Sequence, residues 1–167
     1  MERFQFLAGV IAAHHDHQIV GRTRLQKTVR LLQRLGAPLD YDYMLYFYGP
    51  YSEGLQAEIG ILENLKLVEE QPIQKPGQPS YYILHALEPA LKFAERAEIK
   101  EFQAQISIMN EADATILELA ATYDAFKELG SDNDEAMRRL RQKKGAKCDD
   151  GRDGEAVRLF RELGLES

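Results

Sequence analysis

The chain contains one cysteine, Cys148, among its 167 residues. This count excludes an internal disulfide framework and any zinc site built from several cysteines. The sequence also contains no apolar run near the roughly 18 residues that a membrane helix needs, so we expect no membrane-spanning segment. The start at Met1-Glu2-Arg3-Phe4 lacks the basic n-region and the long apolar h-region of a secretory signal, and we therefore expect a cytoplasmic protein.

Sequence signatures of catalysis are absent as well, because no G-x-G-x-x-G, P-loop or G-x-S-x-G pattern occurs. His14-His15-Asp16-His17 is a dense group of metal-ligand types, but zinc needs three or four fixed ligands and His85 lies far along the chain. The run from Asp149 to Asp153 does not fit a calcium loop, since Gly151 and Phe160 stand where oxygen ligands are needed. We therefore predict a protein that is not an enzyme, with no metal and no cofactor.

Acidic residues outnumber basic residues by 27 to 21, which gives a formal net charge of −6 at pH 7. Residues 1–50 carry six basic and four acidic residues, whereas residues 101–167 carry ten and fifteen. Phosphate contacts dominate the affinity of nucleic-acid binders, so an acidic chain starts at a disadvantage as a DNA-binding protein. Basic residues without an intervening acidic residue run from Arg22 to Arg34, and a second basic cluster lies at 138–147.

Apolar spacing predicts a short helix over residues 3–13 and a clearer helix over 23–35. In the second helix Leu25, Val29 and Leu32 recur at helical spacing and form one apolar face. The opposite face carries three basic side chains, at Lys27, Arg30 and Arg34.

Residues 41–48 are rich in aromatic side chains and bounded by turn residues, which predicts a strand that ends at Gly49-Pro50. Alternation along such a strand places Tyr46 and Tyr48 on the face opposite to Phe47. Ser52 can then cap a helix over 52–66.

Two further runs, 67–74 and 80–85, flank a Pro/Gly loop and predict a β-hairpin. Pro72 implies that its strand lies at a sheet edge. The rest of the chain is predicted to be helical around a polar loop at 145–154. The expected helices are 89–110, 112–130, 131–140 and 156–163.

Helices followed by a two-stranded wing are the plan of a winged helix. We therefore predict a mainly α fold with a small β component. It would comprise a winged-helix-like domain at 1–86 and a C-terminal helical extension at 87–167.

Two motifs resemble a known family. Leu25-Gln26-Lys27 is followed in the same predicted helix by Leu31-Leu32-Gln33, and together they resemble the "KLQK…YLLQ" helix of YwgA-like bacterial and archaeal proteins. Tyr48-Gly49-Pro50-Tyr51-Ser52 resembles their "YGPYS" turn. A looser likeness is to the Panacea domain of toxin–antitoxin systems. The resemblance implies a winged-helix-like scaffold and an uncharacterised or regulatory protein, and it supplies no catalytic motif.

The basic face of the helix at 23–35 is the candidate nucleic-acid-binding surface. Its alternative is an ordinary solvated helix face, which is the default for an amphipathic helix. The helix at 52–66, which would enter a major groove, is acidic and would repel phosphate. The candidate contacts are Arg24, Lys27, Arg30 and Arg34.

The tyrosines around the Gly49-Pro50 turn are the candidate partner-binding residues. The alternative is a turn with a helix cap and packed tyrosines, because Gly, Pro and Ser each have a turn role. The candidate partner contacts are Tyr46, Tyr48 and Tyr51.

Two functions of different classes remain open. The first is a non-enzymatic regulator of the winged-helix type that binds DNA. The second is a protein–protein interaction module, antitoxin-like or an adaptor, that has lost DNA binding. In either case the helices of 89–129 would be available to form a homodimer.

Overall fold

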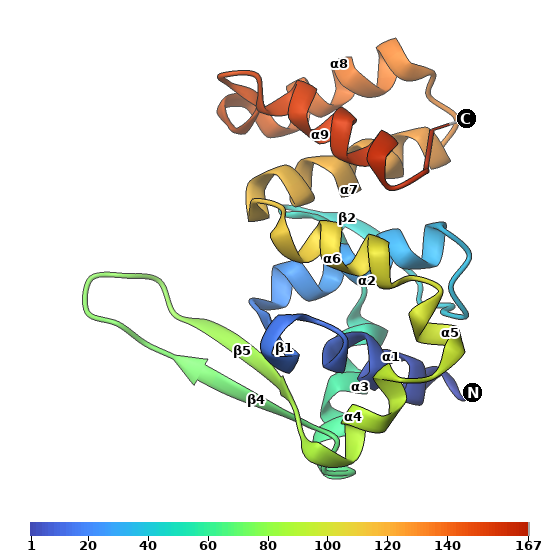
Figure 1. Cartoon of the computed structure of the whole chain (residues 1–167). Helices are drawn as coiled ribbons and strands as arrows, with labels where there is room; N and C mark the ends of the chain where they lie inside the picture. Colours follow the sequence, from blue (N-terminus) through green and yellow to red (C-terminus); the bar gives the residue numbers. More distant parts are fainter. Residues whose placement is uncertain (167) are drawn as a thin grey trace.

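The computed structural model describes residues 1–166 of the chain (Figure 1). Helices dominate it and the strands form two small antiparallel sheets, which confirms the predicted mainly α class with a small β component. The helices are α1 (Arg3–Ala12), η1 (His15–His17), α2 (Arg22–Arg34), α3 (Glu53–Asn64), α4 (Glu88–Ala94), α5 (Ala97–Lys100), α6 (Gln103–Glu111), α7 (Ala114–Glu128), α8 (Asn133–Lys144), η2 (Gly145–Cys148) and α9 (Arg152–Glu162). The strands are β1 (Gln18–Val20), β2 (Met44–Tyr46), β3 (Gly49–Tyr51), β4 (Val68–Ile73) and β5 (Tyr81–Ala86).

The larger sheet has the strand order β1-β5-β4, and both pairings are antiparallel. The sequence analysis missed β1, because three residues give too little alternation to distinguish a strand. Pro72 lies on β4, at the edge of this sheet, as predicted. β4 and β5 form a long hairpin that projects from the body of the molecule (Figure 1).

The C-terminal helices pack directly on the N-terminal part. α7, α8 and α9 form one end of the molecule, and α1, α3 and α4 form the other end, with α2 between them (Figure 1). Every residue of α7 from Ile116 to Phe126 is buried. α7 contacts α2 and β3 on one side and α8 and α9 on the other. The packing therefore crosses the predicted boundary at residue 86, and one hydrophobic cluster includes side chains from both sides of it.

The single long helix predicted over 89–110 is wrong, because this segment forms the three short helices α4, α5 and α6. The chain becomes extended at Arg96, and Phe102 leaves helical geometry before α6 begins. These breaks turn the segment around α1, so that Ile99 and Phe102 are buried in the core. Gly9 of α1 is required for this close approach, since a Cβ there would lie 2.9 Å from Ile99.

The strand predicted over 41–48 is also shorter than expected. Only Met44–Tyr46 forms β2, and Gly49-Pro50 does not end the β structure but begins β3. Gly49 adopts a positive φ of 94°, which an L side chain rarely adopts and which lets the chain reverse tightly after Phe47 and Tyr48. We call β2, the turn and β3 (Met44–Tyr51) the aromatic hairpin.

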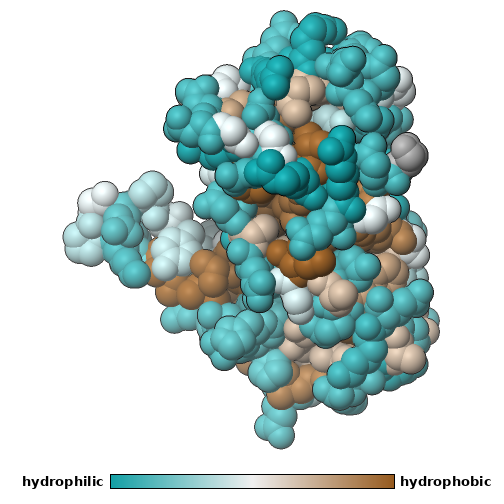
Figure 2. All heavy atoms as spheres, turned by 45° about the horizontal axis from the view of Figure 1, so that its top comes forward, coloured by the Kyte–Doolittle hydropathy of each residue, from teal (hydrophilic) through white to brown (hydrophobic). Residues whose placement is uncertain are grey.

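No helix within residues 1–166 combines the length and the apolar character needed to cross a membrane. In the view of Figure 2 most of the surface is hydrophilic, and hydrophobic atoms gather in the middle of the body and along the base of the projecting β4–β5 hairpin.

Candidate functional site

The two motifs that carry the family resemblance bind each other. Gln26, on α2, holds Ser52 at both backbone groups: its Nε2 donates to the Ser52 carbonyl at 2.9 Å, and the Ser52 N–H donates to its Oε1 at 2.8 Å. The next residue, Lys27, donates from Nζ to the Pro50 carbonyl at 2.7 Å. The Ser52 side chain then accepts from the Leu55 N–H and caps α3. Gln26 and Lys27 therefore fix the backbone of the aromatic hairpin where it enters α3.

Gly49 allows this part of the hairpin to lie against α7. A Cβ at position 49 would lie 2.6 Å from Thr122 Oγ1. The Thr122 hydroxyl itself donates to the Glu118 carbonyl one turn earlier in α7. Position 49 therefore requires glycine both for its φ and for the close contact with α7.

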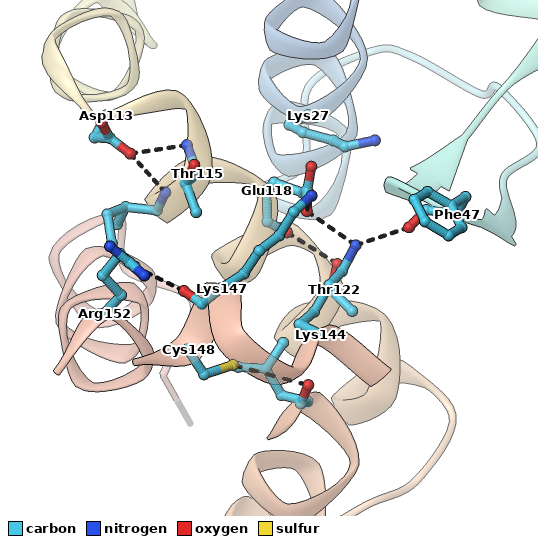
Figure 3. A network of polar contacts seen from close by, with 12 residues as sticks. Lys27, Phe47, Asp113, Thr115, Glu118, Thr122, Lys144, Lys147, Cys148 and Arg152 are labelled. Atoms are coloured by element: carbon cyan, nitrogen blue, oxygen red, sulfur yellow. Dashed lines mark hydrogen bonds and ion pairs between the residues drawn. The ribbon is translucent and has the colours of Figure 1, made fainter. Parts of the chain in front are cut away.

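A largely buried lysine network, in which Lys147 is half-buried, lies under the turn of the hairpin (Figure 3). Lys144 Nζ donates to Glu118 Oε2 at 3.0 Å and to the Phe47 carbonyl at 3.1 Å. Lys147 Nζ donates to the same Glu118 oxygen at 2.9 Å. Lys27 approaches from α2 and is 1% exposed. We call Lys27, Glu118, Lys144 and Lys147 the lysine network; it contains three ammonium groups and one carboxylate.

The environment of the lysine network disfavours the charged form of two of its amines. Desolvation by burial lowers the pKa of Lys27 to about 8; Glu118 opposes this shift, while Lys144 and Lys147 add to it. Desolvation is also the largest cause that lowers the pKa of Lys144, and the hydrogen bond that Lys144 donates to Glu118 opposes this shift. The single carboxylate of the lysine network therefore does not balance the positive charge of Lys27 as well as that of Lys144 and Lys147.

The basic face of α2 is not a solvent-exposed surface at Lys27 and Arg30, which are both buried. Arg30 is 6% exposed and forms ion pairs with Asp124 at 3.4 Å and with Glu128 at 2.8 Å. Arg34 pairs with the same two carboxylates, at 3.0 and 3.1 Å, and its side chain is 33% exposed. The physical reason is the packing of α7 against this face, which supplies the acidic partners.

Arg24 is the remaining candidate phosphate contact. It is half-buried and donates from Nη1 to the Met109 carbonyl at the end of α6, at 2.8 Å. The four candidate nucleic-acid-binding residues therefore all contact other parts of the same chain, at α6, α7 or the aromatic hairpin.

Met44–Tyr48 of the aromatic hairpin is exposed, whereas Gly49 and Pro50 are buried. Phe47, at its turn, is 80% exposed, and Tyr46 and Tyr48, two of the predicted partner contacts, are exposed as well. Tyr51 is half-buried and packs edge-on against Tyr46, with ring centroids 5.6 Å apart. The sequence analysis did not single out Phe47, because strand alternation placed it on the opposite face from Tyr46 and Tyr48, whereas the turn exposes all of them.

A cavity of about 260 Å³ opens between the aromatic hairpin and the start of α2. The residues that line it combine cations, aromatic rings and the hairpin glycine: Arg22, Thr23, Lys27, Tyr46, Phe47, Tyr48, Gly49 and Tyr51. The hairpin thus presents both an exposed aromatic surface and a small recess beside it.

Residues 1–166 contain no group of three or more His, Cys, Asp or Glu side chains that could hold a metal ion. His14 and His17 each use Nδ1 to bond a carbonyl of α1, at Val10 and Ala12.

The chain is similar to a curated protein over about two thirds of its length. "Uncharacterized protein YwgA" of Bacillus subtilis (strain 168) is 32% identical to it over 112 residues. This similarity supports a YwgA-like family for the chain. The match covers 65% of the chain and 66% of YwgA, a little under two thirds of that relative's length. No protein-family model matches the sequence. YwgA is itself named as uncharacterised, so the similarity transfers no activity.

Proposed function

We propose that the chain is a non-enzymatic protein-interaction module, built on a winged-helix-like scaffold, that binds an acidic segment of a partner protein through the aromatic hairpin. One observation carries the proposal: five consecutive apolar or aromatic side chains, Met44 to Tyr48, are exposed on a hairpin whose backbone is fixed from below. Aromatic residues are enriched at protein interfaces, where they bury large areas at little cost in conformational entropy.

Charge complementarity is the reason for an acidic partner. Lys147 lies over the Tyr48 ring, 4.9 Å from its centroid, and the Lys27 side chain lines the cavity beside the hairpin. The lysine network below contains more ammonium than carboxylate groups. Cations that border an aromatic patch favour carboxylates on the partner and speed their association.

The winged-helix part of the proposal is supported by the order of elements in residues 1–86. A helix, a short strand, two helices and a two-stranded hairpin follow one another, and the first strand pairs with the last. The aromatic hairpin is inserted between the second and third helices of this arrangement, α2 and α3.

A display selection with short random peptides tests the interaction module without an identified partner. We expect selected peptides to combine acidic with aromatic or aliphatic residues, and to bind at least about tenfold more weakly to Phe47→Ser, as for a central interface residue. Leu129→Ser is the matched control, because Leu129 is 69% exposed and lies outside the hairpin. Peptides that bind both variants as they bind the unmodified chain would contradict the proposal.

DNA binding is the second candidate, and it is favoured by the same element order and by the projecting β4–β5 hairpin (Figure 1). The charge of α3 argues against it, because this helix exposes Glu53. The cations that could contact DNA near this surface are Lys66, just beyond the end of α3, and Lys75 in the loop of the β4–β5 hairpin. Duplex DNA should be titrated at about 50 and 200 mM salt with the Lys66→Glu/Lys75→Glu variant, and with Lys92→Glu as the control. Binding that falls steeply with salt and is lost in the double variant would favour DNA over the interaction module.

A further inference from the structure

The cavity beside the aromatic hairpin contains a cation that lacks a counter-ion. Within residues 1–166 no carboxylate lies within 4 Å of Lys27 Nζ, whose hydrogen bond goes to the neutral Pro50 carbonyl. An ammonium group has three N–H donors, so two remain. Glu118, the acidic residue of the lysine network, is already bonded to Lys144 and Lys147. Burial of an unpaired charge is costly unless a partner of opposite sign is supplied.

The same cavity is bordered by the N-terminus of α2. Gly21 is the N-cap of this 13-residue helix and provides no side-chain cap, and its first turn contains no acidic residue. Thr23, in that turn, is exposed and lines the cavity. The positive end of a helix favours an anion, so its field acts in the same direction as the Lys27 ammonium.

The size and lining of the cavity restrict what it can hold. Its volume of about 260 Å³ lies below the roughly 300–1,000 Å³ of sites for drug-sized ligands. Four of its eight lining residues are aromatic: Tyr46, Phe47, Tyr48 and Tyr51. Arg22 is already bonded to Glu70 through two nitrogens, so Lys27 is the cation that remains to be compensated. One ammonium among aromatic rings fits a singly charged anion with an apolar body.

We propose that this cavity binds a carboxylate carried on an aromatic or aliphatic group, with Lys27 as its counter-ion. The inference extends the proposed function by naming the chemical group that is recognised beside the hairpin. The carboxylate can belong to a small molecule or to an acidic side chain of the partner, and the two sources share this chemistry.

Phenylacetate is a suitable probe, and phenylacetamide is its uncharged counterpart. The titration of the Lys27 ammonium is followed by NMR with labelled lysine, with and without each compound. Phenylacetate should raise the pKa of Lys27 by about one unit, which corresponds to about tenfold tighter binding to the ammonium form. Phenylacetamide should leave it unchanged.

Three variants locate the site. Lys27→Met should abolish phenylacetate binding, and Lys143→Met, which removes an exposed lysine outside the cavity, should not. Because Lys27 also holds the hairpin, Thr23→Glu provides a test that keeps this contact. It places a carboxylate at the cavity rim, in the first turn of α2 where acidic residues are stabilising, and should weaken phenylacetate binding at least tenfold, or about 1.4 kcal/mol.

Equal binding of phenylacetate and phenylacetamide, no binding of either, or an equal effect of inorganic phosphate would each overturn the proposal. Selected peptides that bind the hairpin while phenylacetate fails would overturn this site and leave the proposed function standing. A selected peptide that loses binding when its Asp or Glu residues become Asn or Gln assigns the carboxylate to a partner. If a selected peptide binds equally well after its Asp or Glu residues become Asn or Gln, and phenylacetate still binds, the carboxylate belongs to a small molecule.

Discussion

Replacement of Gln26 by leucine is the perturbation that tests the link between α2 and the hairpin. Gln26 and Ser52 are both fully buried, and the side-chain amide pairs with both backbone groups of Ser52. In the Gln26→Leu variant the Ser52 carbonyl would keep the N–H of Gln56, at 3.3 Å, as a partner. The Ser52 N–H would have no replacement. An unsatisfied buried donor costs about 1–3 kcal/mol and a lost hydrogen bond about 1 kcal/mol, so we expect a loss of about 2–4 kcal/mol in the free energy of unfolding.

A matched control exists in the same helix. Gln33 makes the same pair of hydrogen bonds to the backbone of Tyr41, both at 3.0 Å, but Gln33 is half-buried and water can replace the lost partner. Gln33→Leu should therefore cost about 1 kcal/mol. Urea denaturation followed by circular dichroism measures both changes, and hydrogen exchange should show the Ser52 amide losing protection in Gln26→Leu. Equal costs for the two variants would refute the reasoning.

Three further predictions concern the same core. Gly49→Ala should lose about 1–3 kcal/mol of stability from backbone strain alone, and Thr122→Ala in the same chain should recover the part due to the 2.6 Å contact, as measured by urea denaturation. The pKa of Lys27 is lowered to about 8 from 10.5, so above pH 8 the unfolded chain binds more protons than the folded chain. The free energy of unfolding should therefore rise by about 1.5 kcal/mol between pH 8 and pH 9.5. Urea denaturation of the Lys27→Met variant should show no such rise. Burial lowers the pKa of His14 to about 4 from 6.5, so the unfolded chain binds more protons than the folded chain in this pH range. The free energy of unfolding should therefore fall by about 3 kcal/mol as the pH drops from 6.5 through 4. A His14→Leu variant whose free energy of unfolding falls equally over this range would contradict this prediction.

For α2, the local sequence pattern predicts the helix and its buried apolar face. The recurrence of Leu25, Val29 and Leu32 predicts the helix to within a residue at each end, and all three side chains are buried as expected. The same pattern cannot show that the opposite face is buried too. Its acidic partners, Asp124 and Glu128, come about 90 residues later, and a basic face that packs on a distant acidic helix has the same local sequence as a solvated one.

The hairpin shows a second limit. Aromatic composition correctly indicates β structure at Met44–Tyr46, but Gly49-Pro50 has the composition of a strand end as much as of a strand start. The positive φ of Gly49 and its close contact with Thr122 determine that the strand starts here, and the contact depends on α7. The composition of Tyr48–Ser52 predicts a turn, whereas Gly49–Tyr51 forms β3, and the contacts of this segment with Gln26 and Lys27 depend on the folded structure.

The helices predicted to support a homodimer are largely used within the monomer. α7 is buried from Ile116 to Phe126, and Ile99, Phe102 and Ile106 of the preceding segment face α1 and the core. Any dimer through residues 89–129 would therefore have to use the remaining exposed side chains of α4 to α6 or those at the ends of α7, such as Leu129.

The basic residues of α2 form contacts within the chain, and we propose that the aromatic hairpin contacts a protein partner. An NMR titration of the backbone amides tests it most directly, with a display-selected acidic peptide in one series and duplex DNA at about 50 mM salt in the other. We expect the peptide to shift the amide signals of residues 44–51, and we expect DNA to leave those of α3 and the β4–β5 hairpin unchanged. Shifts of α3 and β4–β5 with DNA that disappear at about 200 mM salt, together with no peptide effect on the hairpin, would contradict it.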